Sequence, residues 1–172
     1  MKQVETAETL AHAERMLVFA YGSLMHAQEL RRDCPSGNSL GPARLPNYEI
    51  CFPRYSSRRG SLVAGITPRH GAEVWGVLWH ITREDLPALD LREGFRPERP
   101  SRSNSYNRSI VQVETHDGSA TAWTYIASPQ RIKPGQVVNP DYLILLVEGA
   151  VAHDLPPQYV DMLKRLAFSP EL

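Results

Sequence analysis

The chain has 172 residues, 42% of them hydrophobic and 22% charged, which suits one globular domain that needs no disulfide or metal ion for its stability. Lys and Arg together number 19, as do Asp and Glu, so no net charge attracts nucleic acid or an anionic membrane. Cys34, Cys51 and six scattered histidines lack the spacing of metal ligands, so we predict no metal site.

The first segment, residues 1–15, contains several glutamates and no apolar core, so it does not have the pattern of a signal peptide. No apolar run approaches the roughly 18 residues that a membrane-spanning helix needs. We therefore predict an N-terminal extension over residues 1–15, a single domain over residues 16–172, a cytoplasmic location and no membrane partner.

The first half of the chain predicts mainly strands. Residues 17–21 have the apolar character of a buried strand that ends at Gly22, and residues 24–33 favour a short helix with Ser23 as its N-cap. Several glycines and prolines over residues 34–47 indicate a loop. Further strands are predicted at residues 48–53, 61–67 and 73–81, the last from a period-two pattern that includes Trp75 and Trp79.

A short helix is predicted next, because Thr82 and Asp85 match an N-terminal capping signature and Gly94 is a suitable C-terminal stop. Pro87 should make this helix short or irregular. A polar loop over residues 96–105 then leads into a hairpin, with strands at 107–115 and 119–127.

Two amphipathic helices close the chain. One begins with Asn139 as N-cap and Pro140 at the first helical position, and the other begins at Pro156 and Pro157. Because strands dominate the first part and helices the end, we expect an α+β fold with a curved or barrel-like sheet.

Two segments could carry chemistry. The first is "YGSL" at residues 21–24, where main-chain N–H groups of residues 22–25 and the Ser23 hydroxyl could bind a small anion, or where the chain could simply turn from strand to helix. The second is Glu93, at the end of a short helix, where burial and the helix dipole would raise its pKa toward that of an amine. The alternative for Glu93 is a salt bridge to Arg92, Arg96 or Arg108.

The arginines of "PRYSSRRGS", at positions 54, 58 and 59, are interpreted as a solvated loop rather than a phosphate site.

Six motifs in order carry a family resemblance. They are "FAYGSLM" at 19–25, "ARLPNYEICF" at 43–52, "EVWGVLWHIT" at 73–82, "LDLREGF" at 89–95, "NPDY" at 139–142 and "LPPQYVDMLKRL" at 155–166. In this order and spacing the chain resembles the γ-glutamylcyclotransferase-like superfamily over residues 17–167. The resemblance implies a compact mixed β-barrel with flanking helices, and an enzyme that needs no cofactor.

The resemblance also implies a reaction and a site. The α-amine of a γ-glutamyl small molecule attacks its own γ-carbonyl, which forms 5-oxoproline and releases an amine or amino acid. In this pattern Tyr21, Gly22, Ser23 and Leu24 hold the γ-glutamyl group, Glu93 is the general acid and base, and Tyr142 lines the pocket. Tyr106 matches a second tyrosine of the pocket. The protein is expected to act as a monomer or homodimer.

One position departs from the pattern. Members that act on γ-glutamyl amino acids often read Tyr-Gly-Ser-Asn, whereas this chain has Leu24, a residue found in other branches such as the glutathione-specific one. The substrate is therefore open among γ-glutamyl amino acids, γ-glutamylamines, glutathione and a γ-glutamyl-protected specialised metabolite. The competing interpretation is a non-catalytic binding module on the same fold. The Arg-, Pro- and Ser-rich stretch between Glu93 and Tyr106 is expected to form a lid.

Overall fold

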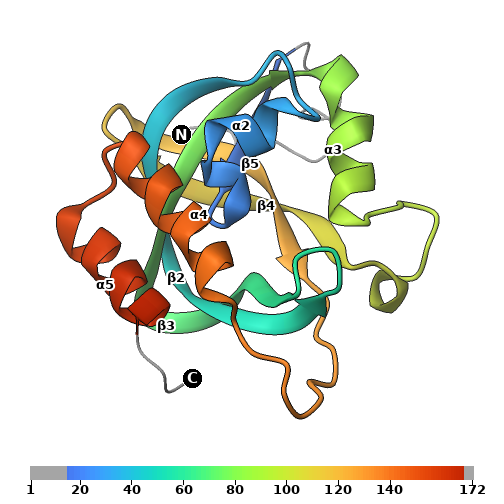
Figure 1. The fold of residues 1–172 in the computed structure, drawn as a ribbon. Helices are drawn as coiled ribbons and strands as arrows, with labels where there is room; N and C mark the ends of the chain where they lie inside the picture. The colour runs from blue at the N-terminus through green and yellow to red at the C-terminus, as the bar shows by residue number, and fades with distance from the viewer. Residues whose placement is uncertain (1–14, 169–172) are drawn as a thin grey trace.

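The computed structural model describes residues 15–168, in which five strands form a closed barrel with helices packed around it (Figure 1). The strands are β1 (Arg15–Ala20), β2 (Asn38–Ser56), β3 (Ser61–Thr82), β4 (Tyr106–Thr115) and β5 (Gly118–Ala127), with the spatial order β1-β3-β2-β4-β5. Neighbours pair antiparallel except β1 and β5, which close the barrel in parallel at Val18 and Trp123. The predicted α+β fold with a mixed β-barrel is confirmed. The predicted N-terminal extension lies outside the described residues, except Arg15, which begins β1.

The hairpin of β2 and β3 forms much of the barrel wall, and the loop predicted over residues 34–47 is wrong for most of its length. β2 already begins at Asn38 and pairs with β3 through a ladder that shifts register between Ser39 and Pro42. Gly41 has a φ of +92° within this irregularity. A bulge accommodates a proline and a left-handed glycine inside a strand, so these residues bend β2 instead of ending it.

The helices frame the barrel. They are α2 (Ala27–Arg31), α3 (Leu86–Glu93), α4 (Pro140–Ala152) and α5 (Pro157–Phe168), with 3₁₀ turns η1 (Ser23–Met25), η2 (Arg83–Asp85) and η3 (Ser101–Ser103). In Figure 1, α4 and α5 lie together on one side of the barrel and α3 lies on the other. The Asn139 side chain caps α4 by accepting a hydrogen bond of 2.9 Å from the Asp141 N–H, as predicted. None of the helices among residues 15–168 has both the length and the apolar character required to cross a bilayer.

Two predicted N-caps are wrong. Ser23 lies inside η1 and makes no capping bond, because Gly22 occupies the cap position and α2 begins only at Ala27. Thr82 precedes η2 but its side chain does not cap it. The Asp85 carboxylate instead accepts hydrogen bonds from the backbone N–H and hydroxyl of Ser36, so this carboxylate ties the loop before β2 to the start of α3.

α4 packs closely against η1, just after the end of β1. A Cβ added at Gly149 of α4 would lie 2.7 Å from the backbone carbon of Met25, so only glycine permits this approach. Tyr142, two turns earlier on the same helix, is thereby held opposite the segment that follows β1. This contact brings α4 to the "YGSL" turn.

Candidate functional site

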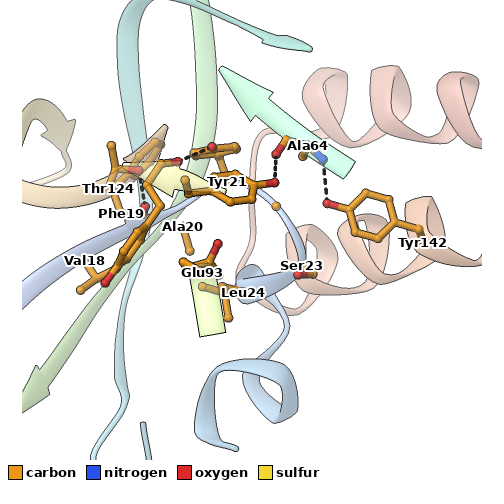
Figure 2. A pocket seen from close by; sticks show the side chains of 13 residues that line it. Val18, Phe19, Ala20, Tyr21, Ser23, Leu24, Ala64, Glu93, Thr124 and Tyr142 are labelled. Carbon is orange, nitrogen blue, oxygen red and sulfur yellow. Dashed lines mark hydrogen bonds between the residues drawn. The ribbon is translucent and has the colours of Figure 1, made fainter. Parts of the chain in front are cut away.

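A pocket opens where β1 ends, and all seven site residues predicted from the sequence line it (Figure 2). Its empty volume is about 390 Å³ including the part open to solvent. The lining residues come from six elements and from the turn after β1; they are Val18, Phe19, Ala20, Tyr21, Gly22, Ser23, Leu24, Ala64, Glu93, Tyr106, Thr124, Tyr125 and Tyr142.

Glu93 reaches this pocket from the last residue of α3. The helix stops there because Gly94 adopts the left-handed conformation, with a φ of +67°, as the sequence predicts. A Cβ at Gly94 would also lie 2.9 Å from the Ser105 side chain, so this turn packs tightly against the segment that leads into β4. Glycine at this position therefore fixes the end of α3, and with it the place of Glu93.

The salt bridge considered for Glu93 is not formed. Within residues 15–168 its half-buried carboxylate accepts no hydrogen bond and has no ion-pair partner. Arg92 points instead to Glu29 and Asp33, at 2.6 and 2.7 Å, and Arg108 binds Asp90 at 2.9 Å. Glu93 is thus left facing the pocket without a neutralising contact.

The protonation of Glu93 follows from this setting. Burial raises its pKa from 4.5 to about 7, against the opposite effect of the nearby positive charges of Arg92, Arg58 and Arg59. A carboxyl group with this pKa is present in both protonation states near neutral pH. It can therefore accept a proton and return it, which an ordinary glutamate does poorly.

The turn after β1 presents free main-chain donors, although fewer than predicted. The Met25 N–H binds the Gly22 carbonyl at 3.0 Å, which removes it from the group of residues 22–25. In the described part of the chain the N–H groups of Gly22, Ser23 and Leu24 have no acceptor. Three donors, together with the Ser23 hydroxyl, thus border the pocket.

Gly22 keeps the pocket open rather than enabling an unusual backbone. Its φ of −115° is accessible to any residue. A Cβ built there would lie 3.4 Å from the Ala64 Cβ and 3.5 Å from the Tyr142 hydroxyl oxygen, so it would project among the lining residues. Any larger side chain would fill space that a ligand needs.

Two of the predicted tyrosines hold one residue of β3. The Ala64 N–H donates a hydrogen bond of 2.9 Å to the Tyr142 hydroxyl (Figure 2). The Tyr106 hydroxyl donates one of 2.7 Å to the Ala64 carbonyl. Burial raises the pKa of Tyr142 to about 12 and raises that of Tyr106 as well, so both phenols are neutral. They shape the pocket wall as neutral hydrogen-bonding groups.

A further polar network, which we did not predict from the sequence, supports two tyrosines that line the pocket. The Tyr21 hydroxyl donates to the Tyr125 carbonyl at 2.5 Å, and the Tyr125 hydroxyl donates to Asp90 at 2.6 Å. Arg108 completes the network through its ion pair with Asp90. Asp90 precedes Glu93 by three positions, so both lie on one face of α3, and this spacing is a signal that could have connected them.

A second, basic groove adjoins the pocket and shares Ser23, Glu93, Tyr106 and Tyr142 with it. Its empty volume is about 850 Å³ including open solvent, and it is also lined by four arginines, at positions 54, 58, 59 and 92. We use the name basic groove for this feature.

The solvated loop predicted for the arginine cluster is wrong for Arg54 and Arg59. Arg54 donates to the carbonyls of Ser105 and Ser128 at 3.1 and 2.9 Å, and Arg59 binds buried Glu29 at 2.5 Å. Burial opposes ionisation of Glu29, yet hydrogen bonds from Arg59 and Arg92 lower its pKa to about 2. The turn between β2 and β3 is therefore anchored beside the site.

The described residues hold no cluster of three or more His, Cys, Asp or Glu side chains arranged to bind a metal ion. Cys34 and Cys51 are both free thiols. The polar groups that face the pocket are accordingly one carboxyl group, hydroxyls and backbone N–H groups.

Comparisons with known proteins agree on one family. Residues 18–143 match the model of a family described as "Gamma-glutamyl cyclotransferase, AIG2-like". The γ-glutamylcyclotransferases of mouse and human are each 28% identical over 158 residues, which cover 89% of this chain and 79% of each relative. A solved structure of a γ-glutamyl cyclotransferase superposes with a TM-score of 0.76 at 28% identity, covering 89% of this chain and 88% of its own.

Proposed function

Because the chain belongs to the γ-glutamyl cyclotransferase, AIG2-like family, we propose that it cyclises the γ-glutamyl group of a small molecule to 5-oxoproline. The other product is the amine or amino acid that was attached to the γ-carbonyl. The proposal assigns the general acid and base to Glu93 and substrate binding to the pocket that contains Tyr21, Ser23 and Tyr142.

The free donors of the turn after β1 suit the carboxylate of the γ-glutamyl group. The N–H groups of Gly22, Ser23 and Leu24 are all without an acceptor among the described residues, and each could donate to an oxygen. Gly22 leaves room for the ligand to approach this backbone. The Ser23 hydroxyl adds a fourth donor, and buried Leu24 supplies an apolar wall for the methylene groups.

The chemistry requires two proton transfers that one group can perform. Glu93 takes a proton from the α-ammonium group, and the freed amine attacks the γ-carbonyl carbon. The new C–N bond closes a five-membered ring. The proton on Glu93 then passes to the leaving nitrogen as the original γ-amide C–N bond breaks. The ring nitrogen loses its second proton, which the released amine takes up, so the products are a neutral lactam N–H and an ammonium group. Because the reacting groups belong to one molecule, binding it in a folded conformation lowers the entropic part of the barrier.

One observation carries the proposal, namely an unpaired, half-buried carboxylate at Glu93 whose pKa is raised to about 7. A structural glutamate in this position would pair with one of the arginines around it. Arg92 and Arg108 instead pair with Glu29 and Asp90. An unpaired carboxyl group that lines a pocket and has a raised pKa is the physical signature of an acid and base catalyst.

Release of 5-oxoproline tests the proposal. The purified protein is incubated with γ-glutamyl amino acids, γ-glutamylamines and glutathione, and 5-oxoproline is quantified by mass spectrometry. We expect turnover of at least one of these compounds, far above the slow spontaneous cyclisation in a control with heat-denatured protein. Thermal stabilisation by γ-glutamyl compounds without any 5-oxoproline release would contradict the proposal and would indicate a non-catalytic binding module.

A further inference from the structure

The basic groove lies where the leaving group of a bound γ-glutamyl substrate must extend. Glu93 lines both the pocket and the basic groove. If Glu93 protonates the leaving nitrogen, the atoms attached to that nitrogen continue past Glu93 into the groove.

Most positive charge in the groove is already neutralised or bound. Arg59 and Arg92 both contact Glu29, and Arg92 also contacts Asp33. Arg54 donates from Nη1 to two carbonyls and from Nη2 to the Ser105 hydroxyl, so most of its donors are occupied although its charge is not neutralised. Of these three arginines, only Arg54 keeps a charge without a carboxylate partner among the described residues.

Arg58 differs from the other three. Its side chain is exposed, and within residues 15–168 it forms no hydrogen bond and no ion pair. It sits in the tight turn between β2 and β3, where Arg59 N–H bonds to the Ser56 carbonyl at 3.2 Å and Gly60 N–H bonds to the Ser57 carbonyl at 3.3 Å. The anchored turn thus presents one unoccupied guanidinium group to the groove.

We infer that Arg58 is a specificity-determining residue that binds a carboxylate on the leaving group. The inference rests on the proposed function and narrows its substrate class to γ-glutamyl amino acids or peptides, in preference to γ-glutamylamines. A guanidinium group presents paired donors that match the two oxygens of a carboxylate, and the field of Arg54 reinforces this attraction. An amine leaving group without a carboxylate has nothing to offer this site.

A matched pair of substrates isolates this interaction. γ-Glutamylalanine and γ-glutamylethylamide differ only in the carboxylate of the leaving group. The measured quantity is the selectivity ratio, the kcat/KM for 5-oxoproline release from the first compound divided by that from the second. Replacing Arg58 also removes a charge that lowers the pKa of Glu93. That effect acts on both substrates and cancels in the ratio.

The variants are Arg58→Gln, which removes the charge, and Arg58→Lys, which keeps it without the paired donors. Arg165→Gln on α5 is the control for loss of an exposed arginine, because Arg165 lines neither the pocket nor the groove. We expect the wild type to favour γ-glutamylalanine. Arg58→Gln should lower the selectivity ratio about 3- to 10-fold, the range for a partly exposed, charge-assisted contact. Arg58→Lys should give an intermediate ratio, and Arg165→Gln should keep the wild-type value.

Each remaining outcome has a distinct meaning. Equal use of the two substrates by the wild type, or an unchanged ratio in Arg58→Gln with an unchanged melting temperature, would overturn the inference and leave the proposed cyclisation standing. Absence of 5-oxoproline from both substrates would overturn this inference, and its absence from the whole panel of γ-glutamyl amino acids, γ-glutamylamines and glutathione would overturn the proposed function as well. A selectivity ratio that falls toward one as ionic strength rises would support the inference, since salt screens a charge pair at an exposed site.

Discussion

Replacing Glu93 by glutamine should make the folded protein more stable at neutral and alkaline pH. Glutamine has the shape of a protonated glutamate and never ionises. Glu93 must ionise inside a half-buried pocket, where burial raises its pKa from 4.5 to about 7. Ionisation in the folded state is therefore costly, and Glu93→Gln removes that cost.

The magnitude follows from linkage between protonation and folding. Below about pH 4.5 the carboxyl group is protonated in both the folded and the unfolded chain, so it has no net effect on stability. Between about pH 4.5 and 7 the unfolded chain loses the proton first, and the folded state is progressively disfavoured. Above about pH 7 the penalty is complete, and at about 1.36 kcal/mol per pKa unit it reaches at most about 3 kcal/mol.

Denaturant unfolding of wild type and Glu93→Gln from about pH 5 to pH 8 measures this effect. We expect the free energy of unfolding of the variant to exceed that of the wild type by up to about 3 kcal/mol at about pH 8, and the gap to narrow toward pH 5. Glu84→Gln, at an exposed position in η2, is the control and should show no such pH-dependent gap. If Glu93→Gln is less stable than wild type at about pH 8, Glu93 is held by a stabilising ion pair and the reasoning is wrong.

Three further predictions concern the same pocket. The pH profile of kcat/KM should have an acidic limb near pH 7, leaving about one-tenth of the plateau at about pH 6, and a limb near 4.5 would contradict the raised pKa of Glu93. Gly22→Val should weaken substrate binding more than Ser23→Ala, which removes one hydroxyl donor worth about 0.5–1.5 kcal/mol, and equal KM values in the two folded variants would refute the role of Gly22. Tyr142→Phe should lower the free energy of unfolding by about 1–3 kcal/mol, because the buried Ala64 N–H loses its acceptor, and an unchanged value would show that another group replaces it.

Elements with strong local signals could be predicted from the sequence. The Asn139 cap of α4, the Gly94 stop of α3 and the hairpin around Gly118 each depend on residues close together in the chain. The strand over the glycine- and proline-rich start of β2 could not be predicted in this way. Its pairing partner Val77 lies far away in sequence, and the bulge at Pro42 appears only when the two strands meet.

The candidate site shows the same division between local and long-range information. The "YGSL" turn and Glu93 could be identified from motifs, and the structure places both at one pocket. The absence of an ion pair at Glu93 could not be predicted, because it depends on the pairing of Arg92 with Glu29, 63 positions away. The mistaken picture of Arg59 as solvated has the same origin, since its partner is also Glu29. Charge pairing across the fold is not visible in local sequence.

The most direct test of the central claim is the rate of 5-oxoproline release by Glu93→Gln, measured at saturating γ-glutamyl substrate beside the wild type and Glu84→Gln. All three proteins should be folded by circular dichroism. If Glu93 transfers the protons of the cyclisation, turnover by Glu93→Gln falls about 10²- to 10⁴-fold while Glu84→Gln stays at the wild-type rate. Turnover by Glu93→Gln within a few-fold of the wild type would contradict the claim.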